Sequence, residues 1–134
     1  MYMLDTDICV YAIKLQAGVL NEILAVGREH ICVSVISEAE LRTGSAKSAA
    51  PLKSLRFLEN FLRPLPIIEF TSSDARVYAH LRARLERAGT PIGALDLLIA
   101  AHALSRDLTL VTNNEREFRR VGGLRVENWA TSPS

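Results

Sequence analysis

The chain has 134 residues, of which 49% are hydrophobic and 23% are charged, and its 16 Lys+Arg nearly balance its 15 Asp+Glu. This composition predicts one globular domain with one core, and it excludes disordered, collagen-like and low-complexity proteins. The formal net charge of +1 also excludes a protein that holds nucleic acid by bulk positive charge.

Short apolar runs alternate with helical patterns along the chain, and turn residues separate them. The predicted elements are a strand over residues 2–4, helices over 6–13 and 19–27, a strand over 31–35, a helix from 37, a helix over 51–62, a strand over 67–70, helices over 71–89 and 95–104, a strand over 108–111, a short helix over 113–118 and an edge strand over 124–129. Asp5 ends the first apolar run, and Thr6 or Asp7 is expected to cap the helix that follows. Gly44 and Ser45 are expected to interrupt the helix that begins at residue 37.

Strands that alternate with helices predict an α/β fold with a central parallel sheet and helices on both faces. The pattern gives four to five strands in a single domain over residues 1–134, of which 131–134 form a frayed tail. In such sheets, ligands bind beyond the carboxyl ends of the strands. The segments to inspect are therefore Asp5, Ser37–Glu40 and Thr112–Asn114.

Cysteine usage and hydropathy predict a cytoplasmic protein. Cys9 and Cys32 are the only cysteines, and we expect both to be small buried side chains in a reducing compartment. No apolar run approaches the roughly 18 residues that a membrane-spanning helix needs. The first residues also lack the basic start and the apolar stretch of a signal peptide, so we expect no membrane contact.

Three acidic residues stand where the predicted topology can bring them together. Asp5 ends a buried strand, Glu40 lies on the first turns of the helix after the second strand, and Asp96 interrupts the most apolar helix. Taken singly, the two aspartates also suit helix N-termini, and Glu40 suits a solvated helix face. Taken together, three such carboxylates repel each other unless they bind a hard cation such as Mg²⁺ or Mn²⁺. That cation can activate water for attack on a phosphodiester.

Six short segments resemble the VapC-type toxins of the PIN-domain family, in the family's order and over nearly the whole chain. They are Met3–Ile8, Ser37–Leu41 with Gly44, Asp96–Ala103, Val111–Asn114, Arg116–Phe118 and Glu127–Trp129. The resemblance implies a small PIN-like α/β domain with Mg²⁺- or Mn²⁺-dependent endoribonuclease activity. It also implies the toxin role in a type II toxin–antitoxin pair, with inhibition by a VapB-type antitoxin.

The resemblance also implies roles for individual residues. Asp5, Glu40 and Asp96 match the family's first three acidic residues, with Asp5 and Asp96 as direct metal ligands and Glu40 as the group that helps to activate water. Similar family members suggest a transfer RNA as substrate, particularly the anticodon loop of initiator tRNA, and contact with DNA only through the antitoxin. They also suggest a homodimer, for which an apolar helix face around residues 55–62 could serve if it is not part of the core.

One position departs from the family pattern. The fourth acid of the family falls where this chain has Asn114, which cannot neutralise a cation. Glu117, three residues on and on the same face of a short helix, is the candidate replacement. We therefore expect one tightly bound metal and an optional weak second one. Thr112 resembles the family's hydroxyl near the site, suited to hydrogen-bond a phosphate or water, and Arg116 is expected to contact a substrate phosphate.

Two alternatives remain open from the residues alone. Asp5-Thr6-Asp7 also resembles the start of a haloacid-dehalogenase-type phosphatase with Asp5 as nucleophile, although Cys9 stands where that motif has Thr or Val and no Lys follows Lys53. The second alternative is a catalytically weak PIN-like module that only binds a partner, which the absent fourth acid motivates.

Other conspicuous residues are predicted to be structural. His102 lies six residues after Asp96 and faces elsewhere, so we expect a packed histidine with satisfied hydrogen bonds. Trp129 is expected to close an edge of the core. The arginines of the helix over 71–89 are expected to form a solvated face.

Overall fold

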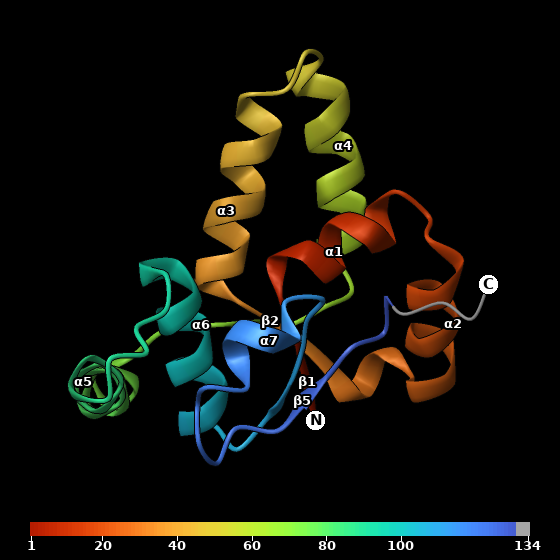
Figure 1. The fold of residues 1–134 in the computed structure, drawn as a ribbon. Helices are drawn as coiled ribbons and strands as arrows, with labels where there is room; N and C mark the ends of the chain where they lie inside the picture. The colour runs from red at the N-terminus through yellow and green to blue at the C-terminus, as the bar shows by residue number, and fades with distance from the viewer. Residues whose placement is uncertain (131–134) are drawn as a thin grey trace.

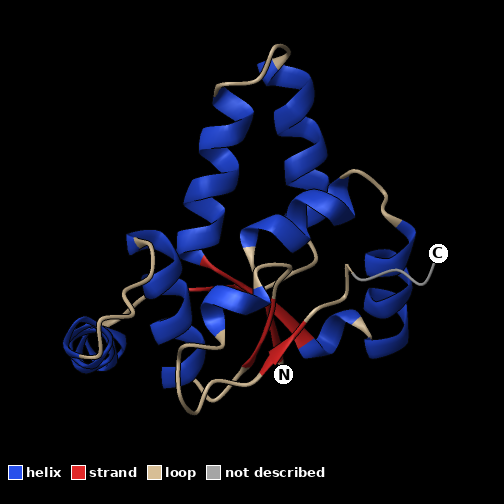
Figure 2. Cartoon of the chain, in the orientation of Figure 1, coloured by secondary structure: helices blue, strands red, loops and turns tan. Residues whose placement is uncertain are grey.

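The computed structural model describes residues 1–130, so the predicted tail at 131–134 lies outside the described residues. A five-stranded sheet in the order β3-β2-β1-β4-β5 forms its centre (Figures 1 and 2). The strands are β1 (Tyr2–Leu4), β2 (Ile31–Ser34), β3 (Ile67–Ile68), β4 (Thr109–Val111) and β5 (Val126–Glu127). Every pairing is parallel, so the carboxyl ends of all the strands emerge at one edge of the sheet.

Helices cover both faces of the sheet, as the alternating pattern predicted (Figure 2). They are α1 (Thr6–Ile13), α2 (Ala17–Val26), a 3₁₀ turn η1 (Arg28–His30), α3 (Val35–Ala46), α4 (Pro51–Leu62), α5 (Ser72–Arg87), α6 (Ala94–Ser105) and α7 (Glu115–Phe118). In Figure 1, α3 and α4 rise side by side from the sheet as a helical hairpin.

Successive strand residues point to opposite faces and so divide the core into two clusters. Leu4 and Val33 contribute to the cluster that includes residues of α1, α2 and α4. Met3 and Cys32 contribute to the cluster that includes residues of α5, α6 and α7. The sheet is therefore buried on both faces, which explains why its strands are apolar runs rather than alternating ones.

The boundary between β2 and α3 differs from the prediction by one residue. β2 ends at Ser34 rather than at Val35, because Val35 is the first residue of α3. The Ser34 hydroxyl accepts a hydrogen bond from the backbone N–H of Ile36 at 3.1 Å and caps the helix.

The predicted interruption of α3 is wrong. The helix continues through Gly44 and Ser45 to Ala46. Ser45 is buried, and its hydroxyl accepts a hydrogen bond from Ser54 of α4 at 3.3 Å. Packing between α3 and α4 therefore outweighs the modest cost of a glycine inside a helix, about 1 kcal/mol.

The two edge strands are shorter than predicted, at residues 67–68 rather than 67–70 and 126–127 rather than 124–129. Each pairs with only one neighbour, so the ladder ends early.

The apolar face predicted for association around residues 55–62 belongs largely to the core. Leu58 and Leu62 are 2% and 5% exposed and pack in the first core cluster. The exposed apolar side chains of α4 are Leu52, Leu55 and Phe57.

Several residues have the structural roles predicted for them. Trp129 is buried beside Tyr2, with a ring distance of 5.2 Å, and its indole N–H donates to Glu127. Cys9 and Cys32 are buried free thiols. Among residues 1–130, no single helix is long and apolar enough to cross a membrane. Only α1 and α2 taken together, with a 104° bend between them, meet that length and composition.

Candidate active site

Asp5 begins the site because it directly follows the central strand. Its backbone is extended, and Oδ1 accepts a hydrogen bond from the N–H of Thr6 at 2.8 Å, so Asp5 itself caps α1 in place of the predicted Thr6 or Asp7. Oδ2 accepts a hydrogen bond from the Thr112 hydroxyl at 2.7 Å. Thr112 follows β4, the neighbour of β1, so the parallel pairing brings together two residues that are 107 positions apart.

Glu40 reaches the same edge of the sheet from α3. The Thr6 hydroxyl donates to Glu40 Oε1 at 2.7 Å and so connects the first turn of α1 to the middle of α3. This bond leaves Glu40 Oε2 without a hydrogen-bond donor among residues 1–130, and its carboxylate is only partly buried.

Asp96 lies in the first turn of α6, whose N-cap Gly93 has no side chain. Burial, followed by the negative charges of Glu117 and Glu40, raises the pKa of Asp96 to about 6. Asp96 therefore lies close enough to both Asp5 and Glu40 for their charges to interact.

Glu117 of α7 lies against Asp96. Its two carboxylate oxygens accept hydrogen bonds from the N–H of Gly93 and from the side-chain amide of Asn114, both at 2.8 Å. The hydrogen bond from Gly93 lowers the pKa of Glu117 against the effect of burial. Asn114 itself is held because its N–H donates to the Thr112 hydroxyl at 3.0 Å. Asn114, which stands where the family has its fourth acid, thus orients Glu117, the carboxylate predicted to replace that acid.

Sequence reasoning missed one member of the cluster. Asp7 was interpreted as a helix cap or as part of a phosphatase motif, yet its carboxyl interacts with those of Asp5 and Asp96. Oδ2 accepts a hydrogen bond from the N–H of Asn113 at 3.1 Å, whereas the buried Oδ1 has no hydrogen-bond partner within residues 1–130. The sequence did contain a signal for Asp7: it lies two residues after Asp5, and so in the first turn of the helix that begins at the strand end.

The cluster carries uncompensated negative charge. Burial, followed by the charge of Asp7, raises the pKa of Asp5 to about 7 against the hydrogen bonds from Thr112 and Thr6. Burial likewise raises the pKa of Asp7. In the described part of the chain, no Lys, Arg or His forms an ion pair with Asp5, Asp7, Glu40 or Asp96.

The carboxylate oxygens of the cluster suit a hard cation that keeps several water ligands better than a cation coordinated by protein side chains alone. Across residues 1–130, no three His, Cys, Asp or Glu side chains are placed to coordinate one metal ion together. Mg²⁺ usually keeps several waters and binds one or two protein carboxylates together with substrate phosphates. Asp5 and Asp96, with the unpartnered oxygen of Asp7 beside them, have the oxygen chemistry and the negative charge for such a site.

The residue predicted to contact a substrate phosphate is Arg116, next to Glu117 in the chain. Arg116 is exposed on α7 and forms no ion pair with any residue from 1 to 130. Its neighbour Arg119 pairs with Glu115 at 2.7 Å, and Arg120 donates to the carbonyl of Pro91.

An apolar groove runs from the acidic cluster along the helical hairpin. Its volume is about 370 Å³, and Thr6 and Glu40 line one part of it. Side chains of α1, α3 and α4 form the remainder, including Val10, Leu41 and Phe57. Of the acidic cluster, Glu40 is the residue that lines this groove.

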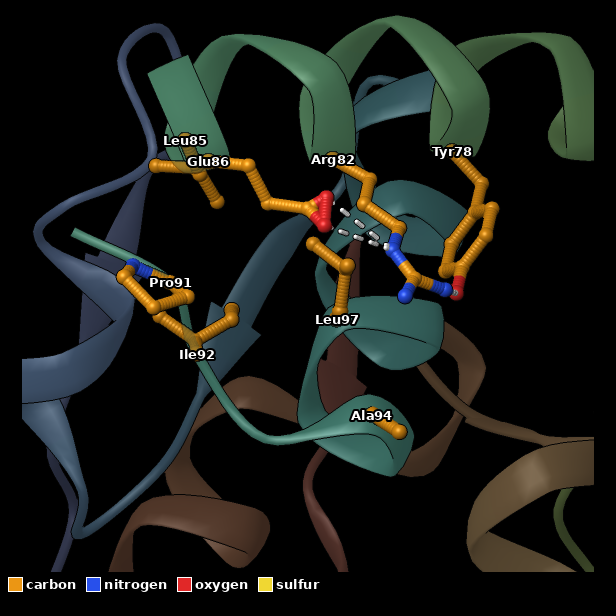
Figure 3. A pocket seen from close by; sticks show the side chains of 8 residues that line it. All are labelled: Tyr78, Arg82, Leu85, Glu86, Pro91, Ile92, Ala94 and Leu97. Atoms are coloured by element: carbon orange, nitrogen blue, oxygen red, sulfur yellow. Dashed lines mark hydrogen bonds and ion pairs between the residues drawn. The ribbon is translucent and has the colours of Figure 1, made fainter. Parts of the chain in front are cut away.

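A smaller cavity of about 100 Å³ lies between α5, α6 and the loop that joins them (Figure 3). Arg82 is the cation among the lining residues that Figure 3 labels; it is paired with Glu86 and donates to the Tyr78 hydroxyl at 3.0 Å. Because its charge is already neutralised and none of the acidic cluster lines it, this cavity is separate from the candidate site.

Residues 2–124 match the family model of the PIN domain. The chain belongs to the PIN-domain family. This PIN domain is 40% identical over 129 residues to a Shigella flexneri protein named tRNA(fMet)-specific endonuclease VapC, an alignment that covers 96% of this chain and 98% of that protein. It is 44% identical over 131 residues to Ribonuclease VapC2 of Rickettsia felis, covering 96% of this chain and 98% of the relative.

Solved structures agree with these sequence relatives. The PIN domain matches a chain of VapBC2 from Rickettsia felis, bound to a DNA fragment from its promoter, with a TM-score of 0.91, 42% identity and coverage of 96% and 98% of the two chains. It matches a chain of DNA-bound VapBC from Salmonella typhimurium with a TM-score of 0.91, 39% identity and coverage of 96% and 97%. These findings confirm the predicted fold and family rather than the phosphatase alternative.

Proposed function

We propose that this PIN domain is a divalent-cation-dependent endoribonuclease that acts as the toxin of a type II toxin–antitoxin pair. It hydrolyses RNA phosphodiester bonds and thereby inhibits translation. The observation that carries this proposal is the acidic cluster, which gathers Asp5, Glu40, Asp96 and Glu117 from four separate segments. Among residues 1–130, no Lys, Arg or His side chain forms an ion pair with Asp5, Glu40 or Asp96.

We propose a role for each side chain of the cluster. Asp5 and Asp96 would hold the cation, which when bound supplies a Lewis acid for a phosphate oxygen and acidifies a water molecule. Glu40 is the candidate base for that water, because the Thr6 hydroxyl fixes one of its oxygens and leaves the other available. Thr112 orients the Asp5 carboxylate, and Gly93 with Asn114 orients Glu117.

The chemistry of the carboxylates supports our proposal of a hard divalent cation. The cluster offers carboxylate oxygens and neither histidine nor cysteine, which favours Mg²⁺, with Mn²⁺ as a substitute, over zinc. Because Asn114 is committed to Glu117, we propose one tight site and at most a weak second one.

The partners proposed for this chain follow from its relatives. The matched VapBC structures contain toxin and antitoxin, so we propose a VapB-type antitoxin that contacts DNA while this chain does not. A segment with apolar side chains and a terminal cation fits the groove that ends at Glu40. We further propose one domain over residues 1–134, a homodimer, and a cytoplasmic location that suits the free thiols.

The name of the Shigella relative makes initiator tRNA the first substrate to test. The assay compares initiator tRNA with elongator tRNA, messenger RNA and ribosomal RNA, in Mg²⁺, Mn²⁺ or EDTA. We expect cleavage that disappears with EDTA, in Asp5→Asn and in Asp96→Asn. Cleavage that persists in EDTA would contradict the proposal. A phosphatase would instead hydrolyse an aryl phosphate, and a pure binding module would bind antitoxin without cleaving RNA.

A further inference from the structure

A buried chain of hydrogen bonds joins β2, α6 and Glu69, which lies in the segment before α5. His102 of α6 has no exposed surface, and its Nδ1 lies 2.8 Å from the hydroxyl of the equally buried Ser34. Its Nε2 lies 3.1 Å from the backbone carbonyl of Glu69. The ring also packs edge-on against Phe70. Both ring nitrogens are thus occupied.

These partners fix the direction of each hydrogen bond. A carbonyl oxygen only accepts, so Nε2 carries the hydrogen, and Nδ1 of the neutral ring is then an acceptor. The Ser34 hydroxyl therefore donates to Nδ1 while accepting from the N–H of Ile36. Neither Ser34 nor His102 retains an unused strong donor.

The chain of hydrogen bonds is not a second catalytic site. Ser34, His102 and Asp74 are residue types of a hydrolytic triad, but all three are 0% exposed. The His102 Nε2 to Asp74 Oδ2 distance of 3.8 Å is too long for a hydrogen bond, and Asp74 accepts two hydrogen bonds from Arg106 at 3.0 Å. Because these buried groups cannot contact a substrate, their role is to hold the surrounding elements in place.

What they connect is the pair of helices that carry two of the candidate catalytic carboxylates. Ser34 caps α3, and Glu40 lies six residues further along that helix. His102 lies six residues after Asp96 on α6. Since helices are rigid over this length, a hydrogen bond between Ser34 and His102 constrains how far Glu40 can shift relative to Asp96.

We propose that His102 is a positioning residue for RNA cleavage, which sets the separation of Glu40 and Asp96 through its hydrogen bond to the Ser34 hydroxyl. This inference rests on the function proposed above. A misplacement of about 1 Å in a catalytic group can cost about 100-fold in rate, so one buried bond at this junction has a measurable effect.

Two variants of His102 separate its two hydrogen bonds. In His102→Asn the side-chain oxygen takes the place of Nδ1 and still accepts from Ser34, but the bond to Glu69 is lost. In His102→Gln the amide N–H takes the place of Nε2 and still donates to Glu69, but the acceptor for Ser34 is lost. Each variant deletes one buried bond, so they serve as matched controls for stability.

The readout is steady-state RNA cleavage at saturating cation over a range of RNA concentrations. We expect His102→Gln to lower kcat by about 10- to 100-fold with KM within about 2-fold, and His102→Asn to stay within about 5-fold of wild type. Ser34→Ala removes the same bond and also the cap on the Ile36 N–H, so it should lower kcat at least as much as His102→Gln, and the double variant should lose little more than Ser34→Ala alone. Equal rates in all folded variants, or equal losses in His102→Asn and His102→Gln, would overturn the inference.

A second readout does not depend on activity. With ¹⁵N-labelled histidine, the spectrum of His102 should show a protonated Nε2 and an unprotonated Nδ1, and Ser34→Ala should shift Nδ1. Backbone amide signals around Glu40 should move in His102→Gln and stay in His102→Asn. Unmoved signals would contradict the inference even if wild-type protein cleaves no RNA, whereas inactive wild-type protein with the expected shifts would count against the proposed function alone.

Discussion

Replacing Asp5 with Asn tests whether the site stores negative charge that a cation neutralises. In the metal-free protein, burial and the charge of Asp7 raise the pKa of Asp5 from 3.8 to about 7. The folded state therefore binds more protons than the unfolded state between these values, and the free energy of unfolding falls as the pH rises from about 4 to about 7. At about 1.36 kcal/mol per pKa unit, ionised Asp5 costs the folded protein about 4 kcal/mol above pH 7.

The variant should recover much of that cost. Asn is as good a helix cap as Asp and keeps an oxygen for the N–H of Thr6. Because Asp5 and Asp7 share the unfavourable charge, we expect Asp5→Asn to stabilise the metal-free protein by about 2 to 4 kcal/mol at pH 8 and by much less at pH 5.

The assay is urea unfolding in EDTA at both pH values, repeated with Mn²⁺ at pH 8. Asp107→Asn is the matched control, because the Asp107 side chain is 87% exposed. Mn²⁺ should stabilise wild type and the control but not Asp5→Asn. An Asp5→Asn protein that is less stable than wild type at pH 8 in EDTA would refute the claim that ionised Asp5 destabilises the metal-free protein. Asp5 would then act only as the N-cap of α1.

Three further predictions concern Glu117, the cation and the buried ion pair. Glu117→Gln should slow metal-dependent cleavage about 10- to 100-fold, whereas Glu38→Gln, which removes a helix-surface ion pair, should change it by about 2-fold or less; equal small effects would remove Glu117 from the site. Calorimetry should show Mn²⁺ affinity rising from pH 6 to pH 8 with release of protons, because burial and neighbouring carboxylates raise the pKa of Asp96 to about 6; a pH-independent affinity would contradict this. Arg106→Ala should lower the free energy of unfolding by about 2 to 3 kcal/mol, since it leaves the carboxylate of Asp74 buried without its cation. Burial alone would raise the pKa of Asp74, but hydrogen bonds led by that from Arg106 lower it, so the stabilisation is full above about pH 4 and is lost at lower pH; unfolding of Arg106→Ala should accordingly depend less on pH below 4.

Much of the site could be predicted because it follows from topology. A buried strand that ends in Asp5, and a parallel neighbour that ends in Thr112, must present both side chains at one edge of the sheet. Glu40 and Asp96 were found by the same rule, because α3 begins directly after β2 and Asp96 lies in the first turn of α6.

The remaining features depend on packing that periodicity does not encode. Asp7 lies in the first turn of α1, which Asp5 caps, and its carboxylate accepts a hydrogen bond from the N–H of Asn113, a residue 106 positions away. Gly44 does not interrupt α3, since contacts with α4 outweigh its low helix propensity. The hydrogen bond between Ser34 and His102 joins residues 68 positions apart, so no local pattern announces it.

The central claim is that Asp5 and Asp96, with Glu40 and Glu117 beside them, bind one divalent cation at the end of the sheet. A crystal of the protein soaked in Mn²⁺ and measured for anomalous scattering tests this claim directly. We predict one strong peak between the carboxylates of Asp5 and Asp96, which disappears in Asp5→Asn crystals. A peak elsewhere, or none at these carboxylates under conditions that support RNA cleavage, would contradict the account.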